Sequence, residues 1–252
     1  MFKPLLRLAL AAGTVALFAA GSASAQFAAV PGRDYAPLNP PQPKITDTPI
    51  EVLEFFAYGC IHCFHLEPRL EKWKTTLPKD TKLTRVPSPV AIRGLDSVPM
   101  YYTLEAMGML DKLHYKIFEA MHNENVILGN PSVRDQWLAK NAVDPKKYQE
   151  VEQSFSVQNK IRAAREYSQK YRIESTPTLV VNGKYSVPNQ RDMDTTFRIV
   201  ESLIATERAS AKTVEAAAPA TPAAAVKATP ATAAPAAKPA PAPSKTSAPA
   251  PK

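Results

Sequence analysis

Two cysteines, Cys60 and Cys63, stand two residues apart where a strand-like run gives way to a helical pattern, and this arrangement most constrains the fold. Residues 50–56 are nearly all apolar, which predicts a strand buried on both faces of an α/β sheet. A helix is expected from about Cys60 to Leu77, followed by a second strand over residues 81–86. In open α/β sheets, functional groups gather beyond the carboxyl ends of strands and beside helix amino termini. The cysteines are therefore predicted to lie at a functional site.

The two ends of the chain differ in composition from its middle. Residues 1–25 combine two basic residues with a short apolar run and end in Ala-Ser-Ala, which predicts a signal peptide cleaved after Ala25 and a mature chain that begins at Gln26. Residues 211–252 are dominated by Ala, Pro, Lys and Thr. This composition buries too little apolar surface to build a core, so we expect a disordered Ala/Pro/Lys-rich tail.

The net charge does not indicate nucleic-acid binding. The chain carries 31 Lys and Arg residues against 23 Asp and Glu residues, a formal net charge of +8. Six of the basic residues lie in residues 1–25 and 216–252, which leaves 25 basic against 23 acidic side chains in residues 26–215. The excess positive charge therefore lies at the ends of the chain, and no nucleic-acid partner is expected.

The middle of the chain begins with a proline-rich segment and contains a long helical one. Residues 26–48 are rich in Pro and turn formers and predict an extended lead-in that lies over the domain. Residues 96–172 are rich in helix formers with spaced apolar residues and predict an all-helical region. Within it, Ser132 and Asp144 are candidate helix caps beside Pro residues.

The last patterned segment predicts a hairpin followed by a helix. Two short runs, Thr-Leu-Val-Val at 178–181 and Lys-Tyr-Ser-Val at 184–187, flank an Asn-Gly dipeptide, which is the strongest short-range hairpin signal. An amphipathic helix is expected over about residues 192–205.

The spacing of the cysteines favours catalysis over structural crosslinking. A Cys60–Cys63 disulfide would close a very small ring and would contribute little as a staple. At a helix start, unpaired backbone N–H groups and the helix dipole favour thiolate over thiol. We therefore predict that Cys60 is the nucleophile, that Cys63 resolves the mixed disulfide, and that the pair forms a redox-active disulfide without a cofactor.

Two further residues are candidates for tuning this chemistry. His62 can donate a hydrogen bond to the Cys60 thiolate or favour it by positive charge, although it could also be an ordinary surface residue at a helix start. Glu54 is an acid within an apolar strand. Burial would raise its pKa and let it exchange protons with Cys63 through a water, unless it lies at a sheet edge and faces solvent.

A metal site is the alternative use of the same residues. Cys60, Cys63, His62 and His65 form a sequence cluster of possible ligands. Zinc sites usually draw their ligands from two separated pairs, and the chain has no other cysteine. No bound metal is expected.

The chain resembles the DsbA family of bacterial periplasmic dithiol oxidases over residues 45–205. The resemblance rests on a helical insertion and on three motifs: Glu54-Phe55-Phe56, Cys60-x-His62-Cys63, and Thr176-Pro177-Thr178 ahead of the Asn-Gly hairpin. It implies an α/β, thioredoxin-like fold in which residues 49–95 and 173–210 form the thioredoxin-like domain and an all-helical domain, residues 96–172, is inserted.

The resemblance also implies the reaction and its partners. An oxidised enzyme in the periplasm would give its disulfide to reduced exported polypeptides with free cysteines, and a membrane reoxidase of the DsbB type would restore it. Pro177 would be cis and face the cysteines, while the backbone of Thr176 would pair with the substrate. Ile61 and Thr176 would touch the sulfurs, and the best-known members carry Pro and Val there.

Two alternative functions share these features. A disulfide isomerase or reductant could use the same fold, but periplasmic isomerases usually bring a separate dimerisation domain, and residues 26–48 are too short to form one. A monomer is therefore expected. A non-catalytic metal- or substrate-binding module is the alternative of another class, in which the cysteines would be incidental.

Overall fold

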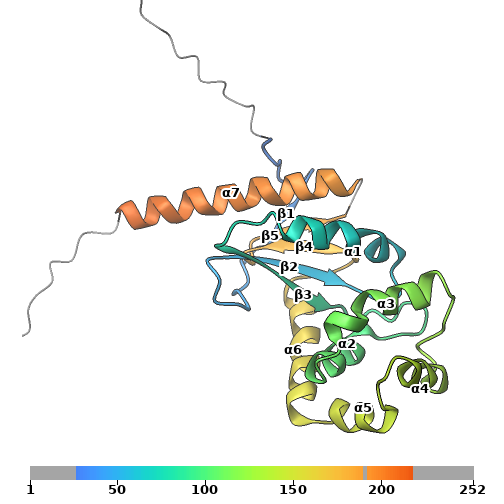
Figure 1. Ribbon diagram of the computed structural model, residues 1–252. Helices are drawn as coiled ribbons and strands as arrows, with labels where there is room; N and C mark the ends of the chain where they lie inside the picture. Colours follow the sequence, from blue (N-terminus) through green and yellow to red (C-terminus); the bar gives the residue numbers. More distant parts are fainter. Residues whose placement is uncertain (1–26, 190–191, 218–252) are drawn as a thin grey trace, which may run out of the picture.

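The structure, a computed structural model, describes residues 27–189 and 192–217 (Figure 1). The expected signal peptide, residues 1–25, and the expected tail beyond Ala217 lie outside the described residues. No helix among the described residues is long and apolar enough to cross a bilayer.

The described chain is built on one mixed sheet with the order β1-β5-β4-β2-β3. Its strands are β1 (Ala36–Pro37), β2 (Ile50–Phe56), β3 (Thr81–Pro87), β4 (Thr178–Val181) and β5 (Tyr185–Pro188). β2 lies inside the sheet, parallel to β3 and antiparallel to β4, and every residue of β2 is buried. The expected central strand is confirmed, and its carboxyl end leads directly to the cysteines.

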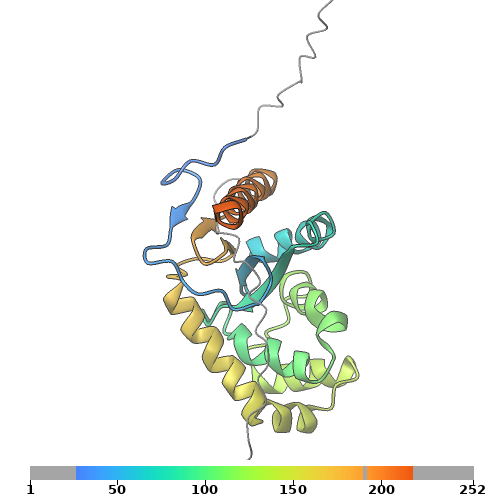
Figure 2. The same ribbon diagram turned by 90° about the vertical axis from the view of Figure 1, so that its left-hand side faces the viewer.

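Helices cover both faces of the sheet (Figures 1 and 2). Successive side chains of β2 point to opposite faces, so both faces are apolar and both need a cover. Val52 packs in one apolar cluster with residues of α1 (Ile61–Lys74) and α7 (Met193–Ala217). Leu53 and Phe55 pack in another, with residues of α2 (Ser97–Ala106) and α6 (Phe155–Lys170). By the same alternation Glu54 shares the face of Val52, so its carboxyl group is directed toward α1.

A helical unit lies between β3 and β4 and consists of α2, α3 (Leu110–His122), α4 (Pro131–Lys140), α5 (Pro145–Glu152) and α6. Its apolar core includes Leu113 and Phe118 and continues without a break to Phe56 and Cys63. Asp144 caps α5 as expected, whereas α4 is capped by Asn130 and not by Ser132, which lies inside the helix. Asn130 precedes Pro131, and its side chain accepts from two backbone N–H groups of the first turn.

The hairpin turn also fastens the lead-in. Asn182 and Gly183 have φ angles of 48° and 66°, as a two-residue hairpin turn requires. A Cβ atom on Gly183 would collide with the backbone carbonyl of Gln42, so this position holds the lead-in at van der Waals distance. The lead-in also joins the sheet, because its β1 pairs with β5 as an edge strand.

The last helix is longer than the sequence pattern indicated. α7 continues to Ala217, so the expected end near residue 205 was wrong, and residues 211–217 are helical where a disordered tail was expected. The apolar stripe ends near Ile204, but residues 206–217 contain neither Gly nor Pro, and Pro219 is the first helix breaker. Beyond the stripe, Glu207 still accepts hydrogen bonds from the β4–β5 hairpin and Arg208 still binds Asp80, and backbone propensity extends the helix past these contacts.

Candidate active site

Cys60 occupies the N-cap position of α1, where its sulfur replaces the usual capping oxygen. Its backbone is extended, with φ −83° and ψ 116°, and its Sγ accepts a hydrogen bond from the backbone N–H of Cys63 at 3.3 Å. When protonated, the same sulfur donates to the backbone carbonyl of Thr176 at 3.2 Å. Cys60 therefore faces both the positive end of a helix and the loop that precedes β4.

Cys63 lies one turn further along α1 and is fully buried, whereas 7% of Cys60 is exposed. Both are free thiols in the structure. This difference in access matches the expected division between an attacking and a resolving thiol, because an incoming sulfur reaches Cys60 more easily.

The environment separates the two thiols by pKa. A hydrogen bond from Cys63 is the largest cause that lowers the pKa of Cys60 to about 5; Thr176 and the backbone N–H groups of Cys63 and His62 act in the same direction, and burial opposes them. Burial raises the pKa of Cys63 well above its usual value, and the neighbouring Cys60 raises it further. Near neutral pH the reduced site therefore carries one thiolate, on Cys60, and one thiol, on Cys63.

The loop before β4 completes the entrance to the sulfurs. The Thr176–Pro177 peptide bond is cis, in agreement with the sequence expectation. The carbonyl of Thr176 faces Cys60, and Ile61, at the first position of α1, is 44% exposed. The three residues expected to contact substrate thus surround or flank the more accessible cysteine.

His62 is placed differently from what the sequence suggested. Its side chain is exposed, and in the described part of the chain its imidazole makes no hydrogen bond with Cys60. Its contribution to the lowered pKa of Cys60 comes from its backbone N–H. No group of three or more His, Cys, Asp or Glu residues in residues 27–189 and 192–217 is arranged to hold a metal ion.

The turn between β2 and Cys60 is held by the helical insertion. The backbone N–H of Tyr58 donates to Ser97 Oγ at 2.8 Å, its phenol OH lies 2.9 Å from His114 Nδ1, and its carbonyl lies 2.9 Å from His122 Nε2. A Cβ atom on Gly59 would collide with the backbone carbonyl of Ile92, so the backbone at Ile92 packs directly on the turn. The insertion therefore fixes the backbone that presents Cys60.

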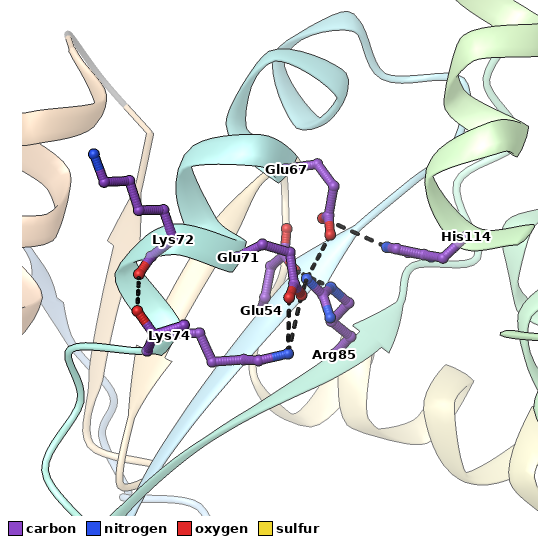
Figure 3. Close-up of polar contacts among 8 residues, drawn as sticks. Glu54, Glu67, Glu71, Lys72, Lys74, Arg85 and His114 are labelled. Atoms are coloured by element: carbon purple, nitrogen blue, oxygen red, sulfur yellow. Dashed lines mark hydrogen bonds and ion pairs between the residues drawn. The ribbon is translucent and has the colours of Figure 1, made fainter. Parts of the chain in front are cut away.

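Three glutamates converge on one arginine between α1 and the sheet (Figure 3), and one of them, Glu54, lies within electrostatic reach of both cysteines. Arg85 of β3 lies beside Glu54 in the parallel register, and its Nε is 3.3 Å from Glu54 Oε2. Its Nη2 donates to both Glu67 and Glu71 of α1. Glu54 and Glu67 are buried, whereas Glu71 is half exposed. The alternative reading of Glu54 as a solvent-facing edge residue is therefore wrong.

This surplus of acids determines the protonation of Glu54. Desolvation is the main cause that raises its pKa to about 8, and the charge of Glu67 adds to the rise while Arg85 opposes it. Neither oxygen of Glu54 makes a hydrogen bond within the described chain. At neutral pH Glu54 is therefore mostly a neutral carboxylic acid within electrostatic reach of the two sulfurs.

Sequence reasoning did not identify Tyr58, Glu67, Arg85 and His114. Glu67 and His114 sit in helical patterns that look like those of ordinary amphipathic helices, and only the packing of α3 against α1 brings them together. Arg85 carried one usable signal, since a charged residue in the strand parallel to β2 stands at the same level as Glu54. Pairing β2 with β3 in register would have found it.

We predict that the reduced protein titrates with a thiolate midpoint near pH 5, followed by ultraviolet absorbance. Because this value lies below the 9.0 of an unperturbed thiol, the thiolate stabilises the reduced fold fully above pH 9, and this contribution disappears as the pH falls through about 5. Cys63→Ala removes the hydrogen bond from the Cys63 side chain, which lowers the pKa of Cys60 most, and should raise the midpoint. A wild-type midpoint at or above the free-thiol value of about 8.5 would contradict the geometry.

Comparisons with known proteins agree with this geometry. A DSBA-like thioredoxin domain matches residues 93–198. The thiol:disulfide interchange protein DsbA of Bordetella pertussis is 37% identical over 79% of this chain and 94% of its own length, and the DsbA of Pseudomonas aeruginosa strain PAO1 is 35% identical over 72% and 87%. Crystal structures of DsbA from Pseudomonas aeruginosa and Xylella fastidiosa superpose with TM-scores of 0.66 each, at 33% and 31% identity, over 72% and 73% of this chain and 95% and 100% of theirs. The expected thioredoxin-like fold with a helical insertion is confirmed. The chain belongs to the DsbA family and is a protein thiol:disulfide oxidoreductase.

Proposed function

We propose that this protein works in the periplasm, where it donates a Cys60–Cys63 disulfide to reduced exported polypeptides. The observation that carries the proposal is the position of Cys60 Sγ at the N-cap of α1, with a pKa lowered to about 5. A sulfur that is stable as a thiolate is a good leaving group, and it favours the reduced enzyme. The oxidised form is then an oxidant toward substrate dithiols.

The exchange balances as two thiolate displacements. A substrate thiolate attacks Cys60 Sγ, the Cys60–Cys63 bond breaks, and Cys63 leaves with the electron pair and takes a proton. The second thiolate of the same substrate then attacks the substrate sulfur that is bonded to Cys60. This forms the substrate disulfide and releases Cys60 as the thiolate. The substrate loses two electrons and the enzyme gains them. Cys63 resolves mixed disulfides at Cys60 in the reverse direction and during reoxidation.

Substrate is held at the loop that precedes β4. The backbone of Thr176, next to the cis Pro177, offers strand-like pairing to an extended chain beside Cys60. Ile61 supplies exposed apolar surface on the other side of the sulfur. His62 acts on the thiolate through its charge when protonated and through its backbone N–H.

Glu54 supplies and receives the proton of Cys63. Its charge contributes to raising the pKa of Cys63, which places the two groups within electrostatic reach. A carboxyl group with a pKa of about 8 can give a proton to Cys63 as it leaves and take one as it attacks, through an intervening water.

Replacement of each cysteine tests the assigned roles. Residues 26–252 with a preformed disulfide should oxidise one equivalent of a reduced dithiol peptide, and Cys60→Ser should abolish the reaction because the attacked sulfur is gone. Cys63→Ala should accumulate a mixed disulfide at Cys60 when a single-cysteine peptide is supplied as its glutathione disulfide, because the Cys60 thiolate displaces glutathione and no second thiol resolves the product; mass spectrometry detects it. Trapping at Cys63 in Cys60→Ser, in place of trapping at Cys60, would reverse the assignment.

The role of Glu54 is tested on the step in which Cys63 attacks. In Glu54→Gln, release of glutathione from a mixed disulfide at Cys60 should slow by up to about 100-fold at pH 8, because the amide cannot accept the proton. Formation of that mixed disulfide should be unchanged. If Gln only removed a negative charge that disfavours the Cys63 thiolate, release would become faster, and the proposed role would be wrong.

Location and reoxidation are tested in cells. We expect the exported monomer to begin at Gln26 and to be recovered oxidised when a membrane quinone-linked reoxidase of the DsbB type is present. Without that reoxidase the two thiols should accumulate in the reduced form, as measured by alkylation of the acid-quenched protein. Equal oxidation in both strains would exclude such a partner, and N-terminal sequencing of the recovered protein checks the cleavage site.

A further inference from the structure

His114 of the helical insertion makes a contact that the reaction steps above do not use. Its ring is buried on α3, with Nδ1 2.9 Å from the Tyr58 hydroxyl and Nε2 3.4 Å from Glu67 Oε2 (Figure 3). Both His114 Nε2 and Glu67 Oε2 are buried, and neither meets the geometry of a hydrogen bond in the described chain. Because buried polar atoms require partners, the 3.4 Å approach between them is the polar contact on which each depends.

The surroundings determine which ring nitrogen of His114 carries the proton. Burial raises the pKa of Tyr58 well above its usual value, so the phenol keeps its proton and is able to donate it to Nδ1. Burial also lowers the pKa of His114, which is therefore neutral at pH 7. A carboxylate can only accept, so the tautomer that suits both neighbours accepts at Nδ1 and carries its single proton on Nε2, the nitrogen 3.4 Å from Glu67 Oε2.

The two buried glutamates consequently differ in the donors they receive. Glu67 has Arg85 at Oε1 and His114 at Oε2, whereas Glu54 has only the Arg85 Nε group at 3.3 Å. The other titratable groups around this ring and the cluster are Glu71 and Lys74 from α1, Tyr101 from α2, and Asp111 and Tyr115 from α3. Arg85 and Lys74 supply two positive charges for three carboxylates, so one acid keeps a proton, and the acid with fewer donors keeps it.

We propose that His114 is a positioning residue of the redox site: its Nε2–H group holds Glu67 as the carboxylate, so that the proton shared by the buried glutamates stays on Glu54. This inference rests on the proposed role of Glu54 toward Cys63. The helical insertion then takes part in the proton chemistry, because the residue that keeps Glu54 of the thioredoxin-like domain protonated comes from α3.

Two substitutions of His114 separate its contacts. The amide of Asn reaches about as far as Nδ1 and can keep the Tyr58 contact, but it leaves Glu67 without its donor. The amide of Gln reaches about as far as Nε2 and can still donate to Glu67. His122→Asn is the matched control, since it removes a half-buried histidine of the same helix that contacts the Tyr58 carbonyl and no carboxylate.

The measurement is an NMR titration of the glutamate carboxyl carbons in the full-length reduced protein, assigned with Glu54→Gln and Glu67→Gln. In His114→Asn the midpoint of Glu54 should fall by about one pH unit or more from its value near 8. His114→Gln should restore this midpoint, and His122→Asn should leave it in place.

Two outcomes would overturn the proposal: an unchanged Glu54 midpoint in His114→Asn, or a shift that His122→Asn reproduces. Failure of the wild-type protein to oxidise a dithiol peptide would instead remove the proposed function, while the carboxyl titration would still decide the role of His114. If His114→Asn does not fold, Tyr58→Phe replaces it, because loss of the phenol hydroxyl frees His114 from the imposed tautomer. A shift of the Glu54 midpoint in Tyr58→Phe is then expected, and the absence of a shift counts against the proposal.

Discussion

A single sulfur at the start of α1 has to satisfy two demands, and much of the surrounding structure follows from that. Cys60 Sγ is the acceptor that caps the helix, through the N–H of Cys63, and it is also the atom that reacts. As a thiolate it is a strong acceptor at the positive end of the helix, whereas in a disulfide it is a weak one. The helix therefore stabilises the reduced state more than the oxidised state, which makes the disulfide a good oxidant.

Holding that sulfur in place requires a rigid turn, and the thioredoxin-like domain does not provide all of it. β2 brings the chain to the site, but the polar groups of Tyr58 are bonded to Ser97, His114 and His122, all from the insertion. The insertion core and the cysteine turn share one apolar cluster. A movement of the helical unit would therefore displace the backbone next to Cys60.

Local patterns in the sequence predicted most of the elements that surround the site. The apolar run of β2, the CxxC motif at the start of α1 and the Asn-Gly hairpin each depend on neighbours within a few residues, and each was found. The β1 pairing and the extension of α7 were not, because one depends on a distant hairpin and the other on helix propensity beyond the apolar stripe. The side chain of His62 was expected near the sulfur, but position alone did not fix its rotamer.

The buried charges were the least predictable part, and the reason is energetic. A carboxyl group in a sequence pattern gives no sign of whether it is paired, and here the pairing runs through three elements: Glu54 on β2, Arg85 on β3 and Glu67 on α1. Their arrangement is not a stability device, because a surplus of buried carboxylate over guanidinium costs desolvation energy that ion pairing does not recover. Protonation of Glu54, whose pKa is raised to about 8, removes most of that cost. In the proposed mechanism this is the proton that the leaving Cys63 thiolate takes up.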